Sequence, residues 1–291
     1  MKPNTRPQDS GTADGTPQFL YLYGIVRQGQ PLPDGTGAEL RAVPYGQLAA
    51  IVEQVPASVF SPEALEEKLQ SVEWVAQTAR KHESVLETAR RHGPVIPARM
   101  CTLFSDFSAV ETSLIKSEDW FRNLLQIFRG RHEWGLKVFC DQKILHAQVA
   151  ADDFDASSLD KAAKSASPGQ AYVLTRKRDA RVAEASDVWI DDAIDEIVGA
   201  VESSAFDFRS RPLLGEDVTG RNDTMVFNLS VLVDEAAQDT FRAAVDDLSS
   251  RFSAYGFGLE LTGPWPPYGF CNQEQRTEYE RRSDVLVEET G

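Results

Sequence analysis

The order of hydrophobic periods in the second half of the chain constrains its fold more than any other feature of the sequence. Apolar residues alternate with more polar ones over residues 225–233, which predicts a β-strand. An apolar stripe with helical spacing follows, made of Ala237, Phe241, Val245, Leu248 and Phe252. Further strands are expected over residues 134–141 and 257–262, a helix over 182–203, and a weak helix or mobile connection over 152–169. The order of strand, helix, short extended piece, strand, helix and strand predicts a ferredoxin-like βαββαβ domain.

The first half of the chain mixes expected strands with two long helices. Ser61 and Pro62 suit the N-cap and first position of one helix, and Ser108 with Glu111 fits a capping box at the start of the other. The elements expected there are strands over residues 19–26 and 48–55, an extended edge or buried loop over 94–104, and helices over 61–92 and 108–129. Together they predict an N-terminal α+β domain.

The length of 291 residues indicates two domains, because a domain usually has roughly 150 residues. We place the boundary near residues 130–133, so that the N-terminal α+β domain covers residues 18–132 and the ferredoxin-like domain covers residues 133–271. Residues 1–17 are rich in Pro, Thr, Gly and Asp and lack the apolar core of a secretory signal, which predicts a disordered extension. Residues 272–291 are expected to form a charged C-terminal tail.

The acidic composition argues against several classes of partner. Thirty Lys and Arg against forty-five Asp and Glu give a net charge of −15 at pH 7, which disfavours nucleic acid and anionic membranes as partners. No run approaches the roughly 18 consecutive apolar residues of a membrane span. Three widely separated cysteines imply no disulfide framework. We therefore expect a cytoplasmic protein that binds neither nucleic acid nor membrane.

The common catalytic and cofactor-binding motifs are absent from the sequence. It contains no glycine-rich phosphate loop, no CxxC pair and no HExxH motif, since Leu86 stands four residues after His82. His82 lies on an apolar helical stripe, which favours a core or interface histidine over a catalytic one. We therefore expect no enzymatic activity, no cofactor and no metal.

Two charge clusters have a structural and a functional interpretation. An acidic cluster such as the one at residues 191–196 is more often a solvated helix face than a cation site. A basic cluster such as the one at residues 176–181 is more often a solvated loop than a surface for an acidic partner. The structural interpretation is favoured for both clusters.

The most specific segment of the sequence is Thr-Gly-Pro-Trp-Pro-Pro-Tyr-Gly-Phe at residues 262–270. Its three prolines lack backbone donors, so we expect the preceding strand to end by Thr262. Rigid aromatic side chains lose little entropy on docking and suit a binding anchor. They also suit a wedge between packed elements, which we favour over a partner contact, and for Trp265 we expect the buried wedge.

Seven segments of the chain resemble, in the same order, the gas vesicle accessory proteins of the GvpL/GvpF family. They are residues 21–26, 79–86 with His82, 94–104, 134–139, 169–177, 225–233 and 263–270. The last segment is the hallmark of the family, and the resemblance covers about residues 18–271. The sequence departs from the family at Met100 and Cys101, where Phe-Gly is usual.

This resemblance implies a fold, a function and a set of binding residues. It implies two α+β domains, the second a modified ferredoxin-like domain, in a non-enzymatic protein needed for gas vesicle formation. It also implies that the chain binds the small hydrophobic shell protein at the gas vesicle, with other gas vesicle accessory proteins as further partners. The residues that we assign to partner binding are Trp265, Tyr268, Phe270 and Arg99, and those that we assign to the structural motif are Gly263, Pro264, Pro266, Pro267 and His82.

Several alternatives stay open at this point. The protein acts as a transient assembly factor or as a minor shell-associated component, and it is an L-type or an F-type member. A different class of function is an enzyme or a small-molecule-binding regulator built on the ferredoxin-like domain, which would require a pocket with convergent polar groups.

Overall fold

The computed structural model describes residues 18–271, which form two compact units. The first unit contains residues 18–129 and 266–271, and the second contains residues 130–265. The first crossing of the chain, after Arg129, lies beside the boundary that the sequence predicts. Residues 266–271, which the sequence assigns to the second domain, lie instead with the first unit. The extension and the charged tail expected at residues 1–17 and 272–291 lie outside the described residues.

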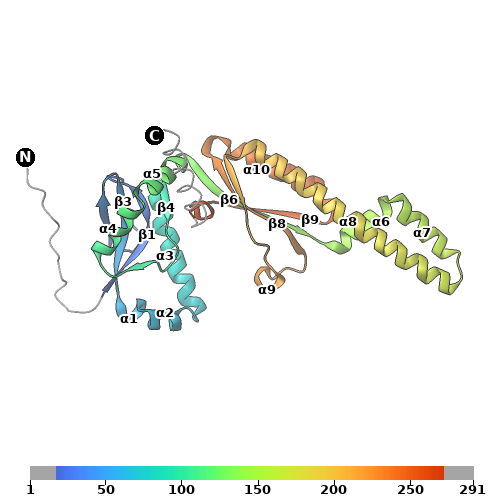
Figure 1. The fold of residues 1–291 in the computed structure, drawn as a ribbon, viewed down its shortest axis with the longest axis horizontal. Coiled ribbons are helices and arrows are strands. Elements are labelled where there is room, and N and C mark those ends of the chain that lie inside the picture. Colours follow the sequence, from blue (N-terminus) through green and yellow to red (C-terminus); the bar gives the residue numbers. More distant parts are fainter. Residues whose placement is uncertain (1–17, 272–291) are drawn as a thin grey trace, which may run out of the picture. The chain divides into compact units, whose positions relative to one another are not determined.

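The first unit is built around an antiparallel sheet with β1 (Gln18–Arg27) at its centre (Figure 1). On one side of β1 lie β3 (Leu48–Pro56) and then β2 (Leu40–Tyr45), and on the other lie β4 (Val95–Pro97) and β5 (Leu103–Phe104). Seven consecutive residues of β1 are buried, as its apolar run requires for a strand covered on both faces. The strands expected over residues 19–26 and 48–55 and the extended edge over 94–104 are confirmed.

Gly24 is required in the middle of β1. A Cβ atom at this position would lie 2.7 Å from the carbonyl oxygen of Ile96 and 3.0 Å from the side chain of Leu86. Only glycine therefore lets β4 pair with β1 while the helix that carries Leu86 packs on the same strand.

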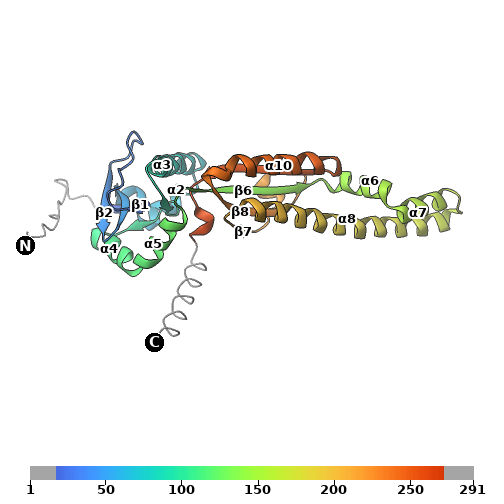
Figure 2. The same ribbon diagram turned by 90° about the horizontal axis from the view of Figure 1, so that it is seen from above.

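Helices cover both faces of this sheet (Figure 2). They are α1 (Ala57–Phe60), α2 (Pro62–Lys68), α3 (Val72–Arg90), α4 (Phe107–Lys116) and α5 (Glu118–Ile127). α3 packs on the face of β1 that carries Tyr21 and Tyr23, through Val85, Leu86 and Ala89. α4 and α5 lie on the opposite side of the sheet, so the unit has three layers with the sheet in the middle.

Both long helices expected in this unit are interrupted. The segment 61–92 forms α2 and α3, because the Ser71 Oγ accepts a hydrogen bond from the Trp74 N–H (3.3 Å) and starts a new helix. The segment 108–129 forms α4 and α5, and α4 is capped by Asp106, which accepts from the Ala109 N–H at 2.8 Å, rather than by Ser108. Internal caps therefore divide stripes that are continuous in periodicity alone.

The second unit contains a four-stranded antiparallel sheet with the order β7-β8-β6-β9. Its strands are β6 (Arg131–Cys140), β7 (Asp207–Ser210), β8 (Thr224–Asp234) and β9 (Phe257–Trp265). Its α-helices are α6 (Gln142–Asp152), α7 (Phe154–Lys164), α8 (Pro168–Ser204), α9 (Glu216–Thr219) and α10 (Gln238–Phe252). The mixed α/β arrangement expected for this half of the chain is confirmed.

The core of the second unit lies between one face of the sheet and the two helices α8 and α10. The alternating apolar residues of β8 supply Leu229, Val231 and Val233 to this core, as the period of two predicts. Ile197 of α8 and Phe241 of α10 are completely buried against them.

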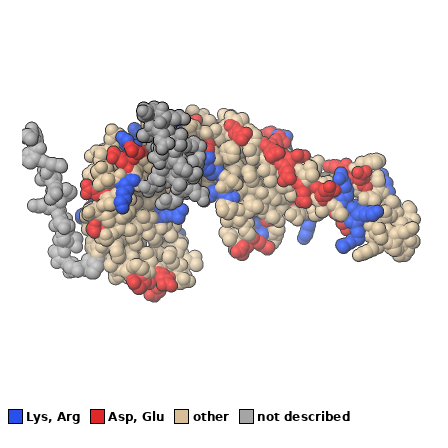
Figure 3. Space-filling model, in the orientation of Figure 1, with Lys and Arg blue, Asp and Glu red and all other residues tan. Residues whose placement is uncertain are grey.

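Three helices occupy the connection between β6 and β7. The weak helix or mobile connection expected over residues 152–169 is ordered as the end of α6, α7 and the start of α8. The Asp153 side chain caps α7 by accepting from the Ala156 N–H (2.7 Å), and Arg181 of α8 donates to the same carboxylate (2.9 Å). α8 begins at Pro168 rather than near residue 182. In Figure 3 the Lys and Arg side chains of this unit gather over α7 and the beginning of α8, beside a region rich in Asp and Glu.

β9 continues past the point where the sequence predicts its end. It runs to Trp265, and its pairing with β6 shifts register between Glu133 and Gly135. The expectation that the strand ends by Thr262 is therefore wrong. β9 is an edge strand, so Pro264 can occupy it without breaking a ladder on a second neighbour.

Candidate functional site

A buried polar network around His82 organises one side of the first unit. His82, on α3, is 2% exposed. Its Nδ1 lies 2.9 Å from the Tyr21 hydroxyl, and its Nε2 lies 3.0 Å from the Ala98 carbonyl oxygen. A carbonyl oxygen only accepts, so Nε2 carries the proton and Nδ1 accepts from the Tyr21 O–H. The Tyr21 oxygen in turn accepts the Cys101 N–H at 3.1 Å.

This arrangement holds His82 in its neutral form. Burial lowers the pKa of His82 below its ordinary 6.5 and outweighs the hydrogen bond to Ala98, which acts in the opposite direction. Burial also raises the pKa of Tyr21, so its hydroxyl keeps its proton. The His82 ring stacks on Tyr23 with a centroid distance of 5.4 Å. A neutral ring with both nitrogens satisfied favours a structural role over a catalytic one.

Two carboxylates border this network, and each accepts a hydrogen bond from a tyrosine. Glu53 of β3 accepts from the Tyr23 hydroxyl at 2.6 Å and forms an ion pair with Lys81 at 2.7 Å. Glu83 of α3 accepts from the Tyr268 hydroxyl at 2.7 Å. Burial, followed by this hydrogen bond, raises the pKa of Tyr268. The carboxylates therefore tie side chains together rather than stand free as general bases.

The network fixes the loop over residues 98–102 and leaves Arg99 at the surface. The Ala98 N–H donates to the Tyr23 carbonyl oxygen, and the Leu22 N–H donates to the Thr102 carbonyl oxygen, each at 2.9 Å. The Arg99 side chain is exposed, and within residues 18–271 its guanidinium takes part in no ion pair. A fixed loop thus presents a positive charge that no carboxylate of residues 18–271 neutralises.

Cys101 lies at the sharpest point of this loop. Its φ of +63° is in the left-handed region, and it is the only non-glycine residue of the described segment with a positive φ. An L-residue with a side chain costs about 1–2 kcal/mol in this conformation. The departure from the Phe-Gly pattern of the family therefore falls at a position whose backbone favours glycine.

We expect Cys101→Val to destabilise the protein by about 2 kcal/mol or more, because a β-branched side chain adds strain at positive φ. The free energy of unfolding of Cys101→Gly should stay within about 1 kcal/mol of the wild type, because the relief of backbone strain offsets the larger conformational entropy that glycine loses on folding. Cys140→Val is the matched control, because Cys140 lies in strand β6, whose backbone β-branched residues favour. Urea unfolding curves check this, and equal losses for the two valine variants would contradict it.

The segment after Trp265 belongs to the first unit and is mostly buried. Pro266, Pro267, Gly269 and Phe270 are buried, and Tyr268–Phe270 forms a short 3-10 turn. Tyr268 packs against the core that contains Tyr21 and α3. Phe270 is 4% exposed. Of the aromatic residues that the sequence assigns to partner binding, these two therefore hold the segment against the protein.

Trp265 itself lies at the end of β9 in the second unit. It is 47% exposed, so the expectation of a buried wedge is wrong. Gly263 has a φ of +130°, and a Cβ atom there would lie 2.9 Å from the Glu133 carbonyl oxygen. The Gly263–Pro264 peptide bond is cis. The hallmark segment thus separates into an exposed tryptophan on β9 and a buried stretch that follows it.

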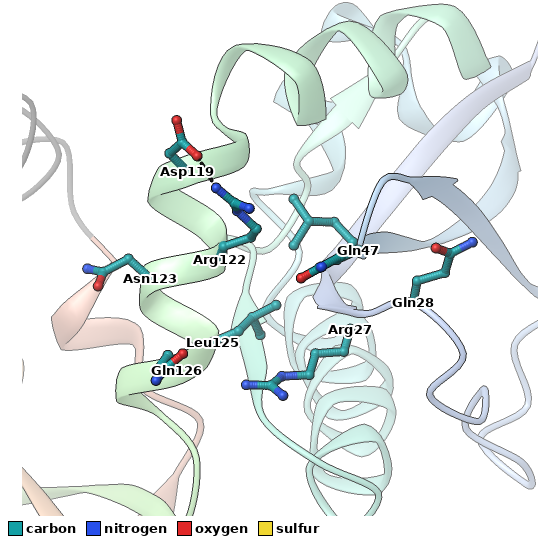
Figure 4. A pocket seen from close by; sticks show the side chains of 9 residues that line it. Arg27, Gln28, Gln47, Asp119, Arg122, Asn123, Leu125 and Gln126 are labelled. Carbon is teal, nitrogen blue, oxygen red and sulfur yellow. Dashed lines mark hydrogen bonds and ion pairs between the residues drawn. The ribbon is translucent and has the colours of Figure 1, made fainter.

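A polar pocket in the first unit lies apart from the residues that the sequence singles out (Figure 4). It is lined by Arg27, Gln28, Gln47, Leu48, Asp119, Arg122, Asn123, Leu125 and Gln126. Arg122 and Asp119 of α5 form an ion pair with each other. None of these lining residues is a Ser, Cys or His, and the one carboxylate, that of Asp119, is held in the ion pair with Arg122.

The remaining candidates for chemistry do not form a site. Within residues 18–271, no group of three or more His, Cys, Asp or Glu is placed to hold a metal ion. No helix in this range is both long and apolar enough to cross a membrane. The acidic residues 191–196 are largely exposed on α8, and the basic residues 176–181 lie on the same helix rather than in a loop.

Sequence reasoning missed the partners of His82. Tyr21 and Cys101 complete the network, and Glu83 holds Tyr268. These residues lie in segments that resemble the family, but the resemblance does not indicate which of them contact one another. The one available signal was the presence of two tyrosines in the apolar run of β1, since a buried tyrosine hydroxyl needs a partner.

Comparison with known proteins gives a consistent result. The family model described as gas vesicle synthesis protein GvpL/GvpF matches residues 19–272. Gas vesicle protein L of Streptomyces sp. (strain CB03234) is 30% identical over 88% of this chain and 94% of its own length. Gas vesicle protein F of the same strain is 29% identical over 86% of this chain and 98% of its own length.

Solved structures show the same fold. The gas vesicle protein GvpF from Anabaena sp. PCC7120 aligns with a TM-score of 0.65 at 17% identity, covering 88% of this chain and 98% of that one. GvpF from Microcystis aeruginosa aligns with a TM-score of 0.60 at 18% identity, covering 87% and 99%. With the family model spanning nearly all of the described residues, this chain belongs to the GvpL/GvpF family of gas vesicle proteins.

Proposed function

We propose that this chain acts in gas vesicle formation by binding the small hydrophobic shell protein, and that Trp265 is the main contact. The observation that carries the proposal is a tryptophan, 47% exposed, within the most specific of the segments that resemble the family. Tryptophan is enriched among the residues that dominate binding energy. An apolar protein that assembles into a shell is prone to aggregate through its exposed surface, and a binder that covers this surface before assembly would prevent that.

The position of Trp265 suits an anchor. Its backbone pairs with Glu133 of β6, so the strand already fixes the residue before a partner arrives. A side chain on a fixed backbone loses less entropy on binding than one on a mobile loop. The net charge of −15 would keep complexes with an apolar partner dispersed. We propose Arg99 as a second contact and other gas vesicle accessory proteins as further partners.

We also propose that the second unit is a modified ferredoxin-like domain. Its order β7-β8-β6-β9 places the first and third strands in the centre and the second and fourth at the edges, with all pairs antiparallel. Helices connect the first strand to the second and the third to the fourth, as in a βαββαβ unit. The modification is the first connection, in which α6 and α7 precede the long α8.

A co-purification experiment tests the binding function. The full chain with an affinity tag is co-expressed with the shell protein, and the shell protein recovered per tagged chain is quantified. We expect Trp265→Ala to reduce this recovery about 30-fold, which corresponds to ~2 kcal/mol.

Phe107→Ala is the matched control, because it removes a 38% exposed aromatic residue from α4 in the first unit. It should leave recovery unchanged. Absence of the shell protein from the wild-type sample would refute the proposed function. Equal recovery with the Trp265 variant would place the contact elsewhere on the protein.

A further inference from the structure

The long helix α8 is divided into a basic and an acidic half. Residues 168–181 contain four basic residues and one acidic residue, whereas residues 182–204 contain seven acidic residues and no Lys or Arg. This gradient stands out in a chain whose net charge is −15. It is seen in Figure 3 as neighbouring blue and red areas over α7 and α8.

The gradient does not serve the stability of the helix. A helix favours negative charge near its N-terminus and positive charge near its C-terminus, and α8 has the reverse order. Some of these charges form ion pairs with neighbouring elements. Arg181 pairs with Asp153 at the N-cap of α7, and Glu196 pairs with Arg251 of α10. Lys177 has no ion pair among the described residues, and Glu184 approaches only Arg181, at 3.7 Å, with its side chain 73% exposed.

An exposed stripe crosses the border between the two halves. Val173, Lys177, Ala180, Glu184 and Val188 follow one another at steps of three or four residues, so they share one face of the helix. All five are exposed, with Val173 at 50% and Val188 at 56%. Two large apolar side chains therefore flank two opposite charges and a small central residue on a face that the described residues leave exposed.

The stripe is complementary to itself when reversed. A second α8 placed antiparallel, with the two-fold axis between residues 180 and 181, sets Val173 opposite Val188 and Lys177 opposite Glu184. Ala180 then lies next to the axis, where its small side chain lets the two helices approach closely. Every contact occurs twice, as a two-fold interface requires. A parallel arrangement would instead set like charges against each other.

We propose that the occupant of this face is a second copy of the chain, bound through antiparallel pairing of α8. Charge complementarity selects this occupant, because each basic half meets an acidic half of the same sequence. One helix pair covers less area than the roughly 800 Å² per partner of a standard interface. The dimer is therefore weak and depends on salt, since its charge pairs lie at the rim.

Sedimentation equilibrium of the full chain tests the pairing. We expect the wild type to dimerise weakly at low salt, as a small interface does, and to dissociate as salt increases. Lys177→Glu and Glu184→Lys should each weaken the dimer at least 10-fold, because both place like charges opposite each other twice. An equimolar mixture of the two single variants should recover the dimer, because each charge reversal in one copy then meets its complement in the other.

Two charge reversals away from the stripe are the controls. Asp246→Lys on α10 and Lys143→Glu on α6 change the net charge by the same amounts, and both residues are exposed. These variants should dimerise like the wild type. A wild type that stays monomeric at low salt would overturn the proposal. So would a Lys177→Glu variant that dimerises as strongly as the wild type, or an equimolar mixture of the two single variants that stays monomeric.

Discussion

Replacing Phe270 by alanine is expected to destabilise the protein by about 3–5 kcal/mol, whereas Trp265→Ala should cost about 1 kcal/mol. Phe270 is 4% exposed and loses nearly all of its packing on truncation, while Trp265 is 47% exposed. The larger aromatic residue of the hallmark segment thus contributes less to folding than the smaller one. Urea unfolding of both variants, followed by circular dichroism, measures the difference in free energy.

Tyr268→Phe separates packing from hydrogen bonding in the same segment. It keeps the ring but removes the hydroxyl that donates to Glu83 at 2.7 Å. We expect a loss of about 1–2 kcal/mol, between those of the other two variants. For the preceding pair of variants, an equal loss of unfolding free energy in Trp265→Ala and Phe270→Ala would contradict the exposed position of Trp265.

His82→Ala should lower the free energy of unfolding by about 3–4 kcal/mol. The substitution leaves a cavity at a position that is 2% exposed, and it removes the partners of the Tyr21 hydroxyl and the Ala98 carbonyl oxygen. His82→Gln keeps an amide that can donate to Ala98, so its loss should be smaller. Equal losses in the two variants would show that the hydrogen bonds contribute little.

The pH dependence of stability provides an independent measurement of the same residue. The unfolded chain protonates His82 near pH 6.5, whereas burial lowers the pKa of the folded state. The unfolded state therefore binds more protons over this range, and wild-type stability decreases as the pH falls from about 7 towards 5. The slope from this residue is at most about 1.4 kcal/mol per pH unit.

The advantage of the wild type over His82→Gln should accordingly shrink between pH 7 and pH 5. Carboxylates such as Asp106 and Asp223, whose pKa values are lowered by hydrogen bonds, affect stability only at more acidic pH. A constant difference between the two proteins across this range would contradict the buried, neutral state of His82.

Local sequence patterns predicted the elements whose burial depends on neighbours along the chain. β8 is predicted by its alternation of apolar and more polar residues, since every second residue faces the core beneath α8 and α10. α10 follows from its stripe for the same reason, with Phe241, Val245 and Leu248 all buried. Seven segments in the family's order, among them residues 263–270 with three prolines and three aromatic residues, indicated the family that the family model confirms.

The helix boundaries were less predictable because they depend on single side chains. Ser71 and Asp106 each accept one hydrogen bond that starts a helix, and neither changes the apolar period around it. A serine at an internal position looks the same in the sequence whether it caps a new helix or lies on the exposed face of a continuous one. The backbone geometry decides between the two.

By itself the sequence determined the position of the long strands, the apolar faces of the helices and the family, because these depend on residues that are close along the chain. Only the tertiary structure decided that Trp265 is exposed while Phe270 is buried, and that His82 is neutral. Tyr21 meets His82 across 61 positions, and Tyr268 meets Glu83 across 185. Such contacts form when separate elements pack together, so no periodicity of the chain encodes them.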